Sequence, residues 1–319
     1  MKQRTLVLLL IGWCLLFLRC ETTEKSMVRA VCLAQAGERW QVVLFYQAPD
    51  AAADAAEASA ALGICTAEGN SAEEARRAAE KFLPQRADYR LCDYLLFPAE
   101  SDSSLLEQYE QDVLAQQCGR TAARMIGTGF DPTEFCAAAE ENEALPDKLL
   151  EKLKTSAPLL PRLYQRGESF LLPVLELGED GFFLADTSQL RSLQGNRTLD
   201  AAQSEMVRLL TGTGGARSFC LAGQQVEIRR CTVSVTVRQD SVRLRLDCQK
   251  RYGSRTPETD FCRQLEQLCC ATVRSLWEQG VDVLYLQQAI ALRYGAKDTI
   301  CPTKNACPRL EADVRFLQF

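Results

Sequence analysis

The chain has 319 residues, of which 47% are hydrophobic and 25% charged, a composition typical of a globular protein with two or three domains. It contains no histidine, which excludes Ser-His-Asp and Cys-His catalytic sites and histidine-ligated zinc. The formal net charge is −5, and an acidic chain suits neither nucleic acid nor a polybasic contact with anionic lipid.

The first twenty residues have the pattern of an export signal. Lys2 and Arg4 precede an apolar run from Leu6 to Leu18, and Cys20 follows shortly after its end. As a helix this run is about 20 Å long, which is short of the roughly 30 Å hydrocarbon layer of a bilayer. We therefore predict a lipoprotein-type signal peptide over residues 1–20, with lipid attached at Cys20.

An uncleaved amphiphilic anchor is the alternative for this leader. Lipoprotein peptidases favour small residues before the cysteine, whereas Phe17-Leu18-Arg19 stand there. In either case we expect the body to lie outside the cytoplasm, held at the outer face of a membrane. No later stretch has eighteen unbroken apolar residues, so no second membrane segment is predicted.

Residues 21–118 have the pattern of an N-terminal α+β domain. Asn70 or Ser71, with Glu74 a few residues on, is typical of a capping box at a helix start. The Ala-rich stretch Pro49–Gly63 reads as a loop or a weak surface helix. The expected elements are a hairpin of Met27–Leu33 and Trp40–Tyr46, a helix to about Phe82, a strand over Tyr89–Phe97, and a helix over Ser104–Gln117.

Residues 119–170 are expected to form a small helical middle segment. Asp131-Pro132-Thr133-Glu134 combines a cap, a proline in the first turn and an acid at the third position, which is typical of a helix start. Pro146 to Lys154 predicts a second helix, and Pro158–Pro161 interrupts the pattern.

Residues 171–319 are expected to form a C-terminal α+β domain. Apolar and polar residues alternate on both sides of Gln239-Asp240-Ser241, which predicts a ribbon with one buried and one solvated face. Glu205 and Glu266 are expected on polar helix faces. The expected elements are a hairpin of Val174–Leu177 and Phe182–Ala185, a helix from Asp200 to about Leu210, the ribbon, a long helix from Thr256-Pro257 to Leu276, and a final strand from Leu310 to Phe316.

The cysteines do not form a metal or redox motif. There are 15 of them, without a Cys-x-x-Cys, and many stand where a small apolar residue would fit. We expect most to be free and buried. Cys301 and Cys307, which bracket a loop with two prolines, are the best disulfide candidate. The elements together predict a multi-domain α+β protein with mixed or antiparallel sheets flanked by helices, without cofactor or metal.

Several short segments of the chain, and the order in which they occur, resemble the Ger(x)C family. The members of this family are the lipoprotein C subunits of spore germinant receptors. The resemblance covers nearly the whole chain, and the order of its short motifs carries it. Glu21-Thr22 and Leu284-Tyr285-Leu286 depart from the family pattern, which indicates a divergent member. The matching segments are the leader with Cys20, Ser71–Ala75, Gly181-Phe182-Phe183-Leu184-Ala185-Asp186, Gln189-Leu190-Arg191-Ser192-Leu193, Leu209-Leu210-Thr211-Gly212 and Val281-Asp282-Val283.

The resemblance implies a non-catalytic, lipid-anchored subunit that couples or scaffolds two integral membrane subunits, A and B, of a nutrient-germinant receptor. It implies a place at the spore inner membrane, on the extracytoplasmic face. Two other function classes stay open. An extracytoplasmic solute-binding lipoprotein would have a ligand cleft between two α/β lobes, whereas the patterns here predict antiparallel ribbons. A carboxylate-dependent cell-wall enzyme would need two acids in one cleft, and the sequence nominates no such pair.

Overall fold

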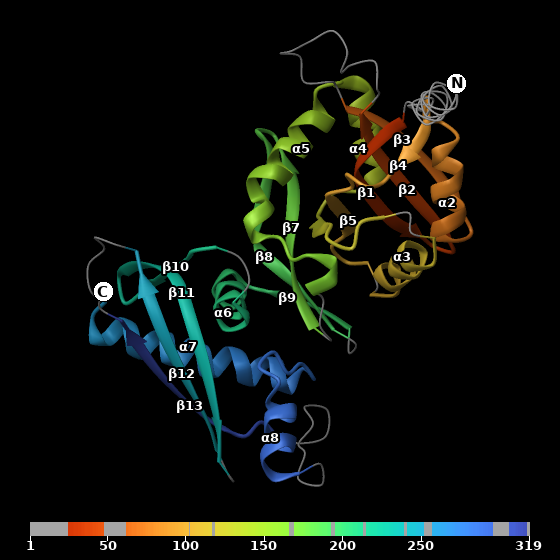
Figure 1. Ribbon diagram of the computed structural model, residues 1–319. Helices are drawn as coiled ribbons and strands as arrows, with labels where there is room; N and C mark the ends of the chain where they lie inside the picture. The colour runs from red at the N-terminus through yellow and green to blue at the C-terminus, as the bar shows by residue number, and fades with distance from the viewer. Residues whose placement is uncertain are drawn as a thin grey trace, which may run out of the picture.

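The strands of the chain form two sheets that are joined by helices (Figure 1). The computed structural model describes residues 25–47, 62–101, 103–116, 119–165, 169–192, 195–212, 215–238, 241–251, 257–295 and 306–317.

The first sheet has parallel strands at its centre and antiparallel strands at both ends. Its order is β3-β2-β1-β5-β6-β7-β8-β9, and the short strand β4 also pairs with β1. Pairing is parallel from β1 through β5 and β6 to β7, and antiparallel in the hairpins on either side. The strands are β1 Lys25–Ala36, β2 Arg39–Gln47, β3 Leu62–Gly69, β4 Arg86–Asp88, β5 Tyr94–Pro98, β6 Arg124–Thr128, β7 Ser169–Gly178, β8 Gly181–Ser192 and β9 Gly195–Leu199.

Helices cover both faces of this sheet, which explains its continuous apolar strands. Leu95 of β5 lies in one buried cluster with Leu105 of α3, whereas the next residue, Leu96, lies in another with Leu149 of α5. Successive strand side chains point to opposite faces, so the two clusters are the two layers of a helix–sheet–helix arrangement. The helices are α2 Ala72–Glu80, α3 Ser103–Gln116, α4 Pro132–Glu141 and α5 Leu145–Ser156, with short 3-10 turns at Ala157–Leu159 and Leu163–Gln165.

Two helix starts confirm predicted caps, and a third has a cap that the sequence analysis did not propose. The Ser71 hydroxyl accepts from the Glu74 N–H at 3.1 Å. Asp131 accepts from the Thr133 and Glu134 N–H groups at 2.7 and 3.2 Å. Asp200 makes a complete capping box at the start of α6, Ala201–Thr211. Each cap satisfies donors that the first helical turn leaves without partners, so a few adjacent residues determine where each helix begins.

The second sheet has the order β10-β11-β12-β13, with an antiparallel ribbon of β11 and β12 and a parallel β12–β13 pair. One face is buried against helices, with Leu244 and Leu246 packed in the cluster that holds Phe261 and Trp277 of α7. The predicted alternation of buried and solvated ribbon residues is confirmed. The elements are α6 Ala201–Thr211, β10 Arg217–Leu221, β11 Gln224–Val237, β12 Ser241–Lys250, α7 Thr259–Glu278, α8 Leu286–Tyr294 and β13 Arg309–Phe316.

A small apolar cluster joins the two sheets. Leu171, Leu190 and Leu199 from the first sheet pack with Val207 of α6 and Leu276 of α7. In Figure 1, α6 lies between β7–β9 and the second sheet. The two parts of the fold therefore share buried surface through α6.

The predicted α+β class with mixed sheets flanked by helices is confirmed, but the first sheet differs from expectation in two respects. Strands β5, β6 and β7 follow one another in parallel through helical crossovers, so the expectation of antiparallel patterns is wrong for this part of the chain. The same sheet also runs across residues 118 and 170, where we expected domain boundaries, because β6 and β7–β9 all belong to it.

No helix in the described ranges is both long and apolar enough to cross a bilayer. The leader with Cys20 and most of the Pro49–Gly63 stretch lie outside the described residues.

Candidate functional site

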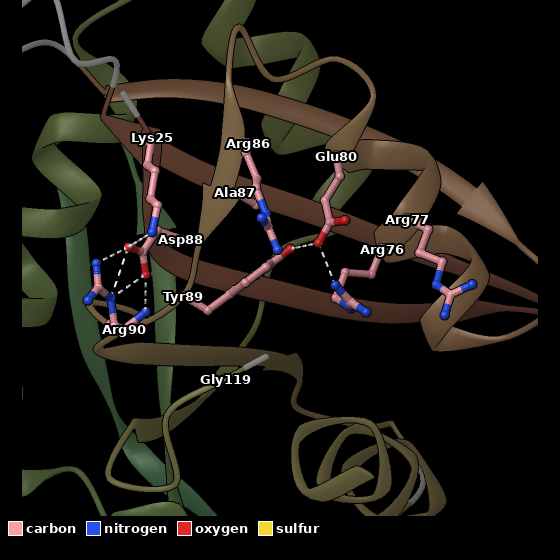
Figure 2. A pocket seen from close by; sticks show the side chains of 10 residues that line it. All are labelled: Lys25, Arg76, Arg77, Glu80, Arg86, Ala87, Asp88, Tyr89, Arg90 and Gly119. Carbon is pink, nitrogen blue, oxygen red and sulfur yellow. Dashed lines mark hydrogen bonds and ion pairs between the residues drawn. The ribbon is translucent and has the colours of Figure 1, made fainter. Parts of the chain in front are cut away.

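A pocket of about 540 Å³ lies where β1 begins, beside α2 and β4 (Figure 2). We call it the basic pocket. Five of its lining side chains are cationic and two are carboxylates, an excess of three positive charges in a chain whose net charge is negative. Its charged residues are Lys25, Arg76, Arg77, Glu80, Arg86, Asp88 and Arg90.

Asp88 and Arg90 form an ion pair with several hydrogen bonds on one side of the pocket. The Arg90 guanidinium donates to both carboxylate oxygens of Asp88, with an Nη2–Oδ2 distance of 2.6 Å, and Lys25 Nζ lies 3.8 Å from Oδ2. These hydrogen bonds and charges hold the pKa of Asp88 at about 2, below its ordinary value of 3.8. Asp88 is therefore an anion at neutral pH and does not serve there as a proton donor.

Glu80, on the other side of the pocket, is also engaged. Its carboxylate accepts from the Tyr89 hydroxyl at 2.7 Å and forms an ion pair with Arg76, whose guanidinium lies over the Tyr89 ring. Burial and the neighbouring carboxylate raise the pKa of Tyr89 above its ordinary value of 10, so its hydroxyl stays protonated. Arg77 pairs with Glu73, just outside the lining, which lowers the local excess to two positive charges.

Arg86 differs from the other arginines of the pocket. Within the described residues its side chain makes no hydrogen bond or ion pair, and Figure 2 shows it between the Asp88–Arg90 pair and the Glu80 group. In the parallel β1–β4 ladder Arg86 is the register partner of Lys25, so the two cations extend from the same face of adjacent strands. Such a like-charge pair is unfavourable unless an anion lies nearby.

A second cavity, of about 340 Å³, lies between the two sheets, and we call it the apolar groove. Phe170 and Leu171 of β7 face it from the first sheet, and Val233 and Val235 of β11 face it from the second. Tyr285 stands at its edge with a positive φ of 53°, a left-handed conformation that is strained for an aromatic residue. The groove has the lining of a site for a small apolar ligand.

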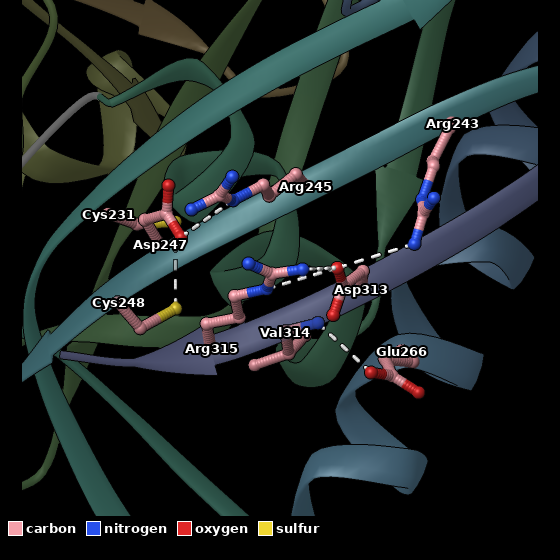
Figure 3. A network of polar contacts seen from close by, with 9 residues as sticks. All are labelled: Cys231, Arg243, Arg245, Asp247, Cys248, Glu266, Asp313, Val314 and Arg315. Carbon is pink, nitrogen blue, oxygen red and sulfur yellow. Dashed lines mark hydrogen bonds and ion pairs between the residues drawn. The ribbon is translucent and has the colours of Figure 1, made fainter.

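The solvated face of the second sheet carries a ladder of paired charges, three arginines with two aspartates (Figure 3). Arg245 pairs with Asp247 at 3.0 Å, and Asp313 pairs with Arg315 at 2.7 Å and with Arg243 at 3.6 Å. Because each of these arginines already has a carboxylate partner, this charged ladder does not attract an anion as the basic pocket does. It is the solvated side of a half-buried ribbon.

Apart from Cys307, whose predicted partner Cys301 is not described, the described cysteines are free, as expected, and most are at least partly buried; Cys220 is exposed. Burial raises the pKa of Cys92 to about 12 and that of Cys136 to about 11, so neither thiol is an effective nucleophile at neutral pH. The Cys231 and Cys248 sulfurs lie 3.6 Å apart across the ribbon, and the hydrogen bond from Cys248 lowers the pKa of Cys231. No group of three or more potential metal ligands occurs among the described residues.

Of the three site residues proposed from the sequence, two lie outside the described ranges and one, Cys307, lies inside them. Cys20 and Cys301 are not described, so lipid attachment and the Cys301–Cys307 disulfide stay predictions. Cys307 is half-buried, and its pKa is raised to about 11 by burial. Glu266, expected on a polar helix face, instead accepts from the Val314 N–H of β13 at 2.9 Å, where it covers the sheet edge.

The basic pocket was missed by sequence reasoning because its charges come from three separated segments. Lys25 begins β1, Arg76 and Arg77 lie on α2, and Arg86 and Arg90 flank Asp88. The spacing of Arg86, Asp88 and Arg90 was the one local signal, since alternate strand positions share a face.

Comparisons with known proteins add little to this geometry. No family model matches the chain, and no curated protein matches it. Among solved structures, the chain is similar to one described as the crystal structure of the GerBC protein. The two share 12% sequence identity with a TM-score of 0.47, over 90% of this chain and 96% of the other. We draw no functional conclusion from a likeness of this size.

Proposed function

We propose that the chain is a non-catalytic subunit of a membrane receptor for spore germinants, tethered to the outer face of the spore inner membrane by lipid at Cys20. The segments that resemble the Ger(x)C family support this assignment. In this role the body couples or scaffolds two integral membrane subunits through protein contacts. A tether raises its effective concentration beside them, so that weak interfaces suffice.

The observation that carries the proposal is the short separation in sequence between Cys20, at the end of the leader, and the start of the folded body. Strand β1 begins at Lys25, five residues after Cys20. Five residue steps extend at most about 18 Å. A lipid at Cys20 would therefore keep the start of β1, and the basic pocket beside it, near the membrane surface.

The chemistry of the basic pocket supports binding rather than catalysis. Its two carboxylates, Glu80 and Asp88, are held by arginines and by Tyr89, and the low pKa of Asp88 does not suit a general acid. This disfavours the carboxylate-dependent enzyme.

Metabolic labelling with a clickable palmitate tests the tether. We expect labelling of the wild type and of Cys14→Ala, a matched change within the leader, and loss of labelling in Cys20→Ala. Equal labelling of Cys20→Ala would remove Cys20 as the anchor. For the receptor role, we expect deletion of the gene to abolish germination with nutrients and to leave germination with an artificial trigger intact. A normal nutrient response would contradict the proposal.

A solute-binding lipoprotein is the second candidate, and the apolar groove between the sheets favours it. Its lining by Phe170, Val233 and Val235 would suit a small apolar solute. Neighbouring genes distinguish the two candidates. Genes for two membrane subunits of a receptor support the first, whereas genes for a transporter permease and ATPase support the second.

A further inference from the structure

The basic pocket concentrates positive charge that the chain does not neutralise. Of its arginines, Arg90, Arg76 and Arg77 each have a carboxylate partner. Arg86 has none within the described residues, and Lys25 makes only the long 3.8 Å contact with Asp88. The pocket therefore offers two incompletely neutralised cations.

Lys25 and Arg86 are also placed to hold one anion together. They are register partners on adjacent parallel strands, which lie about 4.8 Å apart, and their side chains extend from the same face. An anionic oxygen between them would exchange a like-charge repulsion for two charge-assisted hydrogen bonds. The volume of about 540 Å³ admits a group the size of a phosphate with part of the molecule that carries it.

We propose that the basic pocket binds an anionic phosphate group, held chiefly by Arg86 and Lys25 with Arg90 at its edge (Figure 2). The phosphate could be the headgroup of an anionic lipid or a free phosphate compound. The lipid source rests on the proposed tether at Cys20, which keeps the pocket within reach of headgroups. Binding of free phosphate does not depend on the tether.

The first test measures free phosphate. The full chain in a neutral detergent is dialysed against radiolabelled inorganic phosphate, as wild type, as Arg86→Gln and as the control Arg230→Gln. Arg230 is an exposed arginine of β11, outside the pocket, so the control changes the net charge equally. We expect Arg86→Gln to weaken binding about tenfold, the loss of one charge-assisted contact, and Arg230→Gln to leave it unchanged. Equal affinities for the three proteins would contradict the binding of free phosphate by Arg86.

The second test measures lipid. The full chain is reconstituted in phosphatidylcholine vesicles with or without phosphatidylglycerol, and modification of Arg86 by phenylglyoxal is followed by mass spectrometry. Arg243 of the charged ladder is the internal control, because it already has a carboxylate partner. If the lipid headgroup occupies the pocket, phosphatidylglycerol slows modification of Arg86 about tenfold at saturation and leaves Arg243 unchanged.

The outcomes of the two tests distinguish a lipid headgroup from a free phosphate compound. They also distinguish failure of the proposed tether from failure of the pocket. Protection by phosphatidylglycerol supports the lipid source, and phosphate binding in detergent without such protection supports a free compound. If palmitate labelling fails while Arg86-dependent phosphate binding persists, the proposed tether falls and the pocket stands. If the wild type shows no phosphate binding and phosphatidylglycerol gives Arg86 no protection, the proposal is overturned.

Discussion

Replacing Asp88 by Asn should lower stability and raise phosphate affinity at the same time. The substitution keeps the shape of the side chain and removes the charge that Arg90 and Lys25 contact. The fall in the pKa of Asp88 from 3.8 to about 2 corresponds to roughly 2.4 kcal/mol if the pair were unscreened. Because the Arg90 side chain is 79% exposed, solvent screening reduces this value, and we expect a loss of about 1 kcal/mol in the free energy of unfolding at pH 7.

The pH dependence gives the sign of the effect. A carboxylate whose pKa is lower in the folded chain contributes its full stability above the unfolded value near 4, and that contribution is lost as pH falls towards 2. In urea titrations the difference between wild type and Asp88→Asn should therefore be constant from pH 7 to 5 and fall to about half at pH 3. A difference that stays constant down to pH 3, or no difference at pH 7, would refute this account of the ion pair.

Asp313→Asn is the matched control for the expected rise in phosphate affinity. Asp313 pairs with Arg315 two residues on, as Asp88 does with Arg90, and hydrogen bonding to Arg315 lowers its pKa. This control should also lose stability, but it lies on the charged ladder, so its phosphate affinity should equal that of the wild type. Asp88→Asn should bind phosphate severalfold more tightly, because it releases Lys25 and Arg90. Unchanged affinity in Asp88→Asn would mean that the pocket does not bind through these cations.

Three further predictions concern the fold and its thiols. Leu199→Ala, in the cluster that joins the sheets, should cost about 3 kcal/mol in urea unfolding, and a loss below about 1 kcal/mol would show that the junction contributes little. Asp200→Ala should cost about 1 kcal/mol by removing the capping box of α6, measured in the same way; unchanged stability would contradict that role. At pH 8 iodoacetamide should label exposed Cys220 rapidly and Cys92 only after denaturation, as followed by mass spectrometry; rapid native labelling of Cys92 would contradict its burial and raised pKa.

The features that sequence predicted well are those decided by neighbouring residues. The caps at Ser71 and Asp131 each depend on a side chain and an N–H group two or three positions apart. The β11–β12 ribbon was legible for a similar reason, since alternate residues face the core or water along β12 and along the second half of β11, from Cys231 to Val237. Local hydrogen bonding and a strict period of two leave little choice of structure.

The features that were missed depend on contacts between distant segments. Strand β6 has only five residues, Arg124–Thr128, and helices cover both of its faces, so it shows no alternation. Its apolar run is short and is followed by a glycine, and the neighbouring segments were predicted as helices. Nothing in the sequence therefore indicated a strand here. Long-range packing likewise decides which strands share a sheet. The sequence therefore did not show that β7–β9 belong to the first sheet rather than to the second.

The net charge of the chain is a poor guide to the phosphate binding that we propose for the basic pocket. A net charge of −5 averages over a body with a radius of gyration of about 20 Å, whereas screening at physiological salt limits electrostatic interaction to about 8 Å. An anion beside Arg86 therefore experiences the lining charges of the pocket and little of the distant acids. The acidic remainder still opposes non-specific adsorption to an anionic surface. A negatively charged body with the basic pocket near the proposed tether should accordingly contact such a surface in one orientation, set by the pocket rather than by the net charge.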